Sequence, residues 1–204
     1  MSKGVLIVIS GPSGGGKGTV VRRVREMLPD IGFSVSATTR APREGETDGS
    51  DYHFIGKDRF REMIENGEML EYTVYCGNYY GTPRSEVEKV IGSGRDIILE
   101  IEVDGASQIK NKFPDAVTLM LIPPTLSELE KRLRGRGSET EDTVASRLSR
   151  AAEEIKLADI YDYVVVNECD DIDGSASVIC SILTAEHHRS SRMKNEINNF
   201  TDNH

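Results

Sequence analysis

The sequence predicts an α/β fold in which a parallel sheet is flanked by helices. Three observations lead to this prediction. Residues 5–9 (VLIVI) form an apolar run followed by a glycine-rich loop and a segment with helical periodicity. Two later runs, residues 96–103 and 116–122, also have the texture of strands buried in a sheet. Amphipathic helical segments lie between and after these runs, as parallel strands require.

The bulk composition favours one soluble globular protein with a substantial core. The chain has 204 residues, of which 37% are hydrophobic and 29% charged, and its net charge is −9. A general nucleic-acid binder would need surplus cations, so we expect no nucleic-acid partner. Cys76, Cys169 and Cys180 have no spacing that signals a disulfide framework or a zinc site. No run has membrane-spanning or signal-peptide length, so we expect a cytoplasmic protein with no membrane partner.

The first half of the chain predicts a core unit and then an insertion. After the glycine loop, apolar residues recur on one helical face until Pro29. Residues 33–95 differ, with short alternating segments, many glycines and prolines, and one helix expected at 58–66. Five of the seven tyrosines, at positions 52, 72, 75, 79 and 80, fall in this region. We interpret it as a smaller, partly antiparallel subdomain inserted between core elements.

The second half predicts two helices, a strand and a closing helix. After the strand at 116–122, Thr125 and Glu128 have capping-box spacing for a first helix. A break at residues 135–137 separates it from a second helix, for which Ser138 and Glu141 are the expected cap. Residues 161–166 predict the last strand, and the last helix follows Asp170-Asp171. The polar tail is expected to fray.

The segment GPSGGGKGTV (residues 11–20) has the spacing of a phosphate-binding P-loop, G-x-x-x-x-G-K-[ST], with one departure. Between a strand and a helix, such a loop directs backbone N–H groups and a helix N-terminus at phosphate, and Lys17 adds a full charge. Gly18 occupies the position of the usual metal-binding hydroxyl, and Thr19 is rotated by about 100° on a helix. Mg²⁺ would then rest mainly on phosphates and water, oriented by acidic residues on a neighbouring strand. This argues against a switch GTPase, and GKGT resembles the nucleoside monophosphate kinases.

Residues 35–54 contain a candidate site for a phosphate monoester. Arg40, Arg43 and Tyr52 could supply two guanidinium forks and a phenol donor. A lone R-x-x-R is better explained as solvated loop charge. Here Glu71, the segment GNYYGT and the strand ILEIEVDG follow in order, which makes the pattern much more specific.

Together these motifs resemble guanylate kinase, from Val5 to about Leu183. The resemblance rests on GPSGGGKGT, SATTRAPREGETDGSDYHF, GNYYGTP and RLRGRGSETED…SRLSRA. It implies a P-loop NTPase-type core that converts ATP and GMP to ADP and GDP in purine nucleotide metabolism, with Mg²⁺ as cofactor. The implied organisation is core at 1–33, 96–124 and 151–190, a GMP-binding subdomain at 34–95, a helical lid at 125–150 and a polar tail at 191–204.

The resemblance also implies roles for individual residues. The GMP phosphate would be held by Arg40, Arg43, Tyr52 and Tyr80. Guanine would be bound by Ser36, Glu71, Thr82 and Glu102, with Gly105 also in the GMP site. The ATP site would comprise Gly11, Pro12, Ser13, Gly14, Gly15, Gly16, Lys17, Gly18, Thr19, Arg132, Arg136 and Asn167. The catalytic cations would be Lys17, Arg43, Arg136 and Arg147, and Glu100 is the candidate to orient the metal's waters. Glutamates stand at 100 and 102 where some relatives have aspartates, which leaves their metal and base contacts less well defined.

Two alternatives stay open at this point. One is a non-catalytic guanylate-kinase-like module that binds phosphorylated peptides, which the presence of Lys17 and the lid arginines argues against. The other is a monophosphate kinase with a different base preference, which Glu71 and the hydroxyls at positions 36 and 82 argue against. The sequence supplies no argument about a homo-oligomer.

Overall fold

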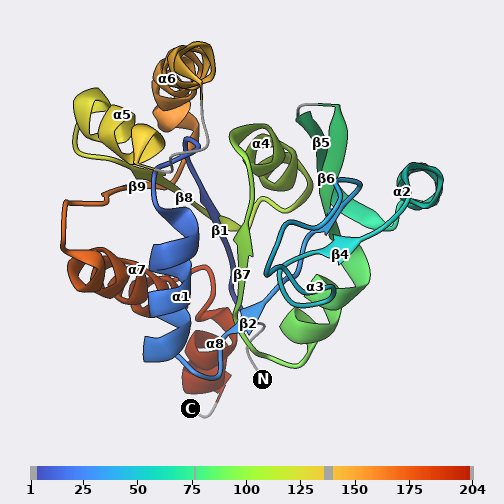
Figure 1. The fold of residues 1–204 in the computed structure, drawn as a ribbon. Coiled ribbons are helices and arrows are strands. Elements are labelled where there is room, and N and C mark those ends of the chain that lie inside the picture. The colour runs from blue at the N-terminus through green and yellow to red at the C-terminus, as the bar shows by residue number, and fades with distance from the viewer. Residues whose placement is uncertain (1–3, 76, 136–139, 203–204) are drawn as a thin grey trace.

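A five-stranded parallel sheet forms the centre of the molecule (Figure 1). The computed structural model describes residues 4–75, 77–135 and 140–202. The strand order is β2-β7-β1-β8-β9, and each neighbouring pair runs parallel. The strands are β1 (Leu6–Ser10), β2 (Gly32–Phe33), β7 (Ile97–Glu100), β8 (Val117–Ile122) and β9 (Tyr163–Val166).

Helices cover both faces of this sheet. On one face, α1 (Lys17–Met27) and α7 (Ile172–His187) pack on a core that includes Ile7, Leu119 and Val24. On the other face, α3 (Arg84–Gly92) and α4 (Val103–Lys112) pack on a separate apolar cluster. Because side chains alternate along a strand, neighbouring β1 residues such as Leu6 and Ile7 enter opposite clusters. The fold class is therefore confirmed.

A second, four-stranded sheet lies beside the first, in the order β4-β3-β6-β5. Its strands are β3 (Ala37–Thr38), β4 (His53–Phe54), β5 (Met69–Tyr75) and β6 (Asn78–Pro83). The β3–β6 and β5–β6 pairs are antiparallel and β3–β4 is parallel, so the predicted mixed character is confirmed. Helix α2 (Lys57–Glu65) packs on this sheet, with the Phe60 ring stacked on Tyr79 at 5.2 Å between centroids.

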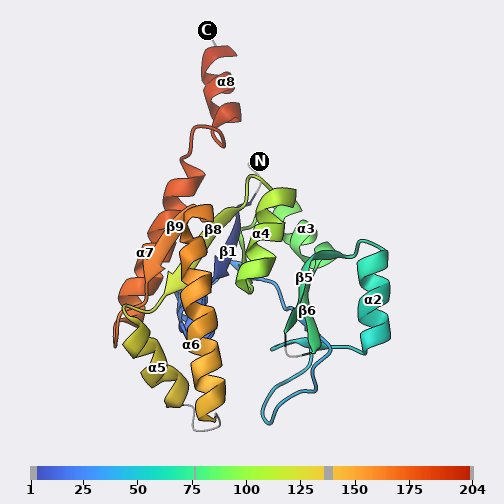
Figure 2. The same cartoon turned by 90° about the horizontal axis from the view of Figure 1, so that it is seen from above.

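Two further helices lie near the strand ends of the central sheet, on the side opposite the second sheet (Figure 2). Helix α5 (Leu126–Arg134) begins at Thr125, whose hydroxyl accepts a hydrogen bond from the Glu128 N–H, as predicted. Helix α6 (Glu141–Ile155) packs on α5 through Leu129, Leu133 and Val144, and continues into the short 3₁₀ helix η1 (Lys156–Ile160). Among the described residues, no helix is long and apolar enough to cross a bilayer.

Four details of the predicted elements were wrong or incomplete. The strand expected at 96–103 ends at Glu100, and α4 begins at Val103, so Glu102 is a helix N-cap instead of a strand residue. Helices α3 and α4 were not predicted. The N-cap of α6 is Thr140, which accepts from the Thr143 N–H, and Ser138 lies outside the described residues. The tail is not frayed throughout, because α8 (Lys194–Asp202) forms within it and extends away from the body in Figure 2.

Candidate active site

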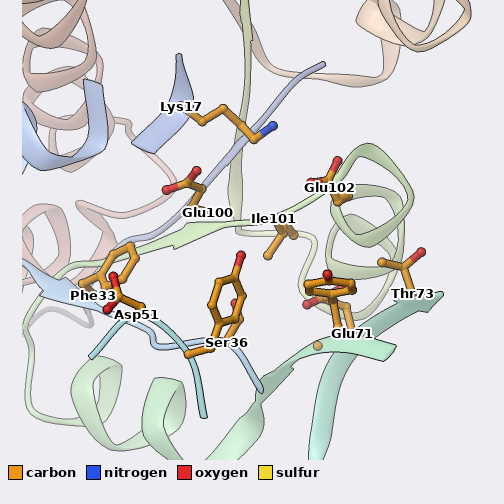
Figure 3. Close-up of a pocket in the computed structure, with 12 residues that line it drawn as sticks. Lys17, Phe33, Ser36, Asp51, Glu71, Thr73, Glu100, Ile101 and Glu102 are labelled. Carbon is orange, nitrogen blue, oxygen red and sulfur yellow. The ribbon is translucent and has the colours of Figure 1, made fainter. Parts of the chain in front are cut away.

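Two adjoining cavities lie between the two sheets, where β1 and β7 end. The first is lined from the central sheet by Glu100 and Ile101 and from the second by Glu71 and Thr73. The second extends over the glycine loop to Arg147 of α6. Both cavities share Lys17, Tyr52, Tyr80, Glu100 and Glu102. In Figure 3, Lys17, Glu100 and Glu102 lie on one side of the first cavity, and Ser36 and Glu71 lie on the other.

The glycine loop connects β1 to the N-terminus of α1. Gly16 is the N-cap with φ 92°, and a Cβ there would approach Asn167 Nδ2 to 2.3 Å. Lys17 is the first helical residue, and its side chain turns back so that Nζ donates to the Gly11 carbonyl at 2.6 Å. The loop therefore presents a helix N-terminus and a buried ammonium group to the second cavity. Pro12, Ser13, Gly14, Gly18 and Thr19 also line that cavity.

Glu100 faces Gly18 across the end of β7. A Cβ built on Gly18 would lie 3.7 Å from both carboxylate oxygens of Glu100, which is ordinary van der Waals contact. The carboxylate thus adjoins the place where most P-loops carry a hydroxyl. Burial raises the pKa of Glu100, the charge of Lys17 opposes that change, and the charge of Glu102 adds to it.

Three predicted ATP-site residues, Gly15, Arg132 and Asn167, contact one another at the glycine loop. The Asn167 amide, directly after β9, donates to the Gly15 carbonyl at 2.8 Å. Arg132 of α5 donates to the Asn167 carbonyl at 3.1 Å and to the Gly15 carbonyl at 3.4 Å. Glu128, one turn earlier on α5, holds the Arg132 Nε at 3.0 Å.

Helix α6 also contacts the loop. The Arg147 guanidinium donates to the Ser13 hydroxyl at 3.4 Å, which places this predicted catalytic cation beside the phosphate loop. Helix α5 packs nearby, since a Cβ on Gly14 would lie 2.9 Å from Leu133 Cδ2. The other predicted lid cation, Arg136, lies outside the described residues.

Arginines and tyrosines gather on the opposite wall of the second cavity. Glu46 receives two hydrogen bonds from the Arg40 guanidinium, at 2.8 and 2.9 Å, and one from the Arg43 backbone N–H at 2.7 Å. The Arg43 side chain is exposed and lines the cavity. The rings of Tyr52 and Tyr80 meet edge to face at 6.0 Å. Burial and the nearby Glu100 charge raise the pKa of Tyr52 to about 12.

The far end of the first cavity contains a buried carboxyl group. Glu71 is 2% exposed, and its Oε1 accepts a hydrogen bond from the Thr82 hydroxyl at 2.7 Å. A Cβ on Gly105 would lie 2.4 Å from Glu71 Oε2, so only glycine fits against this carboxyl group. Burial raises the pKa of Glu71 to about 7, although the Thr82 hydrogen bond and the Lys112 charge oppose it. Ser36 and Glu102 line the same cavity.

The sequence reasoning missed several cavity residues, and simple patterns could have revealed two of them, Thr73 and Arg22. Thr73 is two positions after Glu71 on β5, so the alternation of a strand places both on one face. Arg22 is four positions after Gly18 on α1, and therefore lies on the same helical face. Asp51 lines the first cavity from the loop before β4, where no periodic signal exists.

Comparisons with known proteins agree with this geometry. The family model described as Guanylate kinase matches residues 3–186. The chain is 51% identical to the guanylate kinase of Lactococcus lactis subsp. lactis over 191 residues, covering 94% of this chain and 92% of that protein. It is 50% identical to the guanylate kinase of Halalkalibacterium halodurans over 191 residues, covering 94% and 93% of the two chains.

The chain belongs to the guanylate kinase family. A solved guanylate kinase from Anaplasma phagocytophilum superposes with a TM-score of 0.77 at 36% identity, covering 94% of this chain and 90% of that one. Family membership confirms the predicted activity, the ATP-dependent phosphorylation of GMP by a nucleoside monophosphate kinase. The non-catalytic phosphopeptide module is not favoured.

Proposed function

We propose that the two cavities divide the guanylate kinase reaction between them, with GMP in the first and the ATP phosphates over the glycine loop in the second. The observation that carries this proposal is the buried Glu71–Thr82 pair, at 2.7 Å, at the far end of the first cavity. Guanine presents N–H donors at N1 and N2, which a carboxylate accepts, and an oxygen acceptor at O6, which a hydroxyl can satisfy. Adenine has a hydrogen-bond acceptor at N1 and an amino donor on C6, the reverse of guanine at both positions, so this site selects guanine. Ser36 and Glu102 complete the set of polar groups toward the base.

The phosphate of GMP would lie between the two cavities, against Arg40, Arg43, Tyr52 and Tyr80. Arg40 is already oriented by its two hydrogen bonds with Glu46, so a phosphate meets a guanidinium held in place. The exposed Arg43 guanidinium can reach the same group as a fork. The Tyr52 phenol, which lines the cavity beside Tyr80, is protonated at neutral pH and can donate to the same phosphate.

The ATP phosphates would be held by the loop from Gly11 to Thr19, with Arg132 and Asn167 toward the nucleoside. In this arrangement Lys17 exchanges its hydrogen bonds with the Gly11 and Pro12 carbonyls for contacts with phosphate oxygens. Arg147 would approach the transferred group from α6, and we assign Arg136 to the same step on the family resemblance. The second pKa of a phosphate monoester is about 6, so GMP is largely dianionic at neutral pH and needs no general base. Catalysis then consists of alignment and charge neutralisation during in-line transfer.

The residues around Gly18 fit a magnesium ion bound mostly through phosphates and water. Glu100 supplies carboxylate oxygens, which Mg²⁺ prefers, beside the position that lacks a hydroxyl. Glu100 would hold Mg²⁺ through its water ligands, and Glu102 contributes further negative charge nearby. When bound, Mg²⁺ neutralises charge on the phosphate oxygens.

Substitution of Lys17 tests the assignment of the two cavities. We expect Lys17→Met to lower kcat at least about a hundredfold while the Kd for GMP stays within about threefold. Although Lys17 lines both cavities, its ammonium group is bound to the Gly11 and Pro12 carbonyls of the glycine loop, where the ATP phosphates would lie. The control is Lys131→Met on α5, a substitution of the same kind at a side chain that is 76% exposed. Near-normal turnover of Lys17→Met, or an equal loss of GMP binding, would refute the assignment.

A further inference from the structure

Arg150 of α6 contacts three structural elements at once. Its Nε donates to Glu154 on the same helix at 2.7 Å. Its guanidinium lies 3.8 Å from the Asp104 carboxylate in the first turn of α4. The same group lies over the ring of Tyr75, at the end of β5, with 5.0 Å between Cζ and the ring centroid. One side chain thus connects the lid helix with the half of the molecule that contains the GMP site.

The Tyr75 contact continues toward the phosphate side of that site. The Tyr75 ring meets the Tyr80 ring edge to face at 6.5 Å, and Tyr80 meets Tyr52 at 6.0 Å. On the same helix, one turn before Arg150, Arg147 contacts the Ser13 hydroxyl of the glycine loop. Helix α6 is therefore attached to both substrate sites, through two arginines three residues apart.

We propose that Arg150 is a positioning residue that couples occupancy of the GMP site to the placement of α6, and so of Arg147. This inference rests on the proposed function, since it assumes that Tyr80 and Tyr52 contact GMP. When GMP holds Tyr52 and Tyr80 in place, their ring contacts also restrict Tyr75. The contact between Tyr75 and Arg150 then restricts the position of α6. Arginine suits the role because its planar guanidinium stacks on a ring while its Nε bonds a carboxylate.

The test is a double-mutant cycle on Arg150 and Tyr75. Arg150→Ala also removes the partner of Glu154, which is 8% exposed, so a loss of activity in this variant alone could reflect misfolding. Tyr75→Leu leaves the Arg150–Glu154 pair intact and removes the ring together with its hydroxyl, for which Tyr75→Phe is the control. A cation over an aromatic face at an exposed site is worth a factor of about two to five, so we expect Tyr75→Leu to lower kcat with GMP by about that factor. Tyr75→Phe should stay within twofold of the wild-type kcat.

The decisive readout is the affinity for a non-hydrolysable ATP analogue, measured by calorimetry with and without saturating GMP. We expect GMP to tighten analogue binding about two- to fivefold in the wild type and to leave it unchanged in Tyr75→Leu, Arg150→Ala and the double variant. The control is Lys156→Ala, which removes the ion pair with Glu153 and should keep the full effect. A merely structural Arg150 would lower Tm without changing the effect of GMP.

Additive losses in the cycle, or an undiminished GMP effect in Tyr75→Leu, would overturn the inference. Failure of the proposed function would be visible separately, because the wild-type protein would then show no GMP binding at the first cavity.

Discussion

Replacing Glu71 with glutamine should stabilise the fold and weaken GMP binding in the same variant. Burial raises the pKa of Glu71 from 4.5 to about 7, because the charged form is poorly solvated at 2% exposure. The folded protein therefore holds this proton more tightly than the unfolded chain does. The free energy of unfolding must fall as the pH rises from about 4.5 through about 7, and the cost is fully present above that range.

The magnitude follows from the pKa change. Each pKa unit corresponds to about 1.4 kcal/mol, so the raised pKa of Glu71 costs the folded state about 3 kcal/mol at pH 8. At pH 5, where this group ionises in the unfolded chain alone, the cost is about 1 kcal/mol. Glutamine has nearly the same shape, accepts the Thr82 hydrogen bond through its carbonyl and does not ionise. The advantage of Glu71→Gln over the wild type should therefore grow by about 2 kcal/mol between these two pH values.

Urea unfolding at pH 5 and pH 8 measures this difference. With a slope of about 2 kcal/mol/M for a chain of this size, the midpoint of Glu71→Gln should gain about 1 M on the wild type between pH 5 and pH 8. Other titrating groups are common to both proteins and cancel. If the midpoints of Glu71→Gln and the wild type differ by the same amount at both pH values, burial does not raise the pKa of Glu71.

GMP binding should weaken in Glu71→Gln although the fold becomes more stable. Hydrogen bonds to a charged group are worth about 1.5–3 kcal/mol, so Glu71→Gln should bind GMP about ten- to a hundredfold more weakly at pH 8. The wild type should also gain affinity between pH 6 and pH 8 relative to the variant, which serves as the control for titration of the GMP phosphate itself. A variant that is more stable and binds GMP normally would remove Glu71 from the base site.

Two glycine substitutions should have opposite outcomes. Gly18→Ser should fold at least as stably as the wild type and retain activity within about threefold. The added Cβ has room beside Glu100, and serine is a better helix residue than glycine by about 0.5 kcal/mol. A lower urea midpoint for Gly18→Ser would contradict this. Gly105→Ala should raise the KM for GMP about tenfold or more. Its Cβ would lie 2.4 Å from the present position of Glu71 Oε2, so the Glu71 carboxyl group would have to move. Unchanged GMP kinetics would show that this carboxyl group can move without affecting the base site.

The sequence predicted the elements whose periodicity was strong and local. The buried strands, the glycine loop and the Thr125 cap each depend on residues within a few positions of one another, so their physical cause is visible in the chain. The error at residues 96–103 has a specific reason. Alternating apolar residues continue through Val103, but Val103, Ala106 and Ile109 also recur at helical spacing and pack as α4. Periodicity over so short a run cannot distinguish the two.

The site was predicted by motif, but its geometry depends on contacts between distant parts of the chain. Nothing local indicates that Gly105 adjoins Glu71, that Glu100 adjoins Gly18, or that Arg150 lies over Tyr75. The raised pKa of Glu71 likewise arises from burial that only the assembled fold provides. These long-range relations are therefore findings of the structure.

The most direct test of the base-reading site is ADP release with GMP and with AMP as phosphoryl acceptors. A site built to hydrogen-bond its substrate rejects an analogue with the wrong pattern by a factor of about 10⁴, because buried polar groups such as Glu71 lose their partners. We predict that kcat/KM for GMP exceeds that for AMP by at least about a thousandfold. Equal values for the two acceptors would contradict the assignment of Ser36, Glu71 and Thr82 as the residues that select guanine.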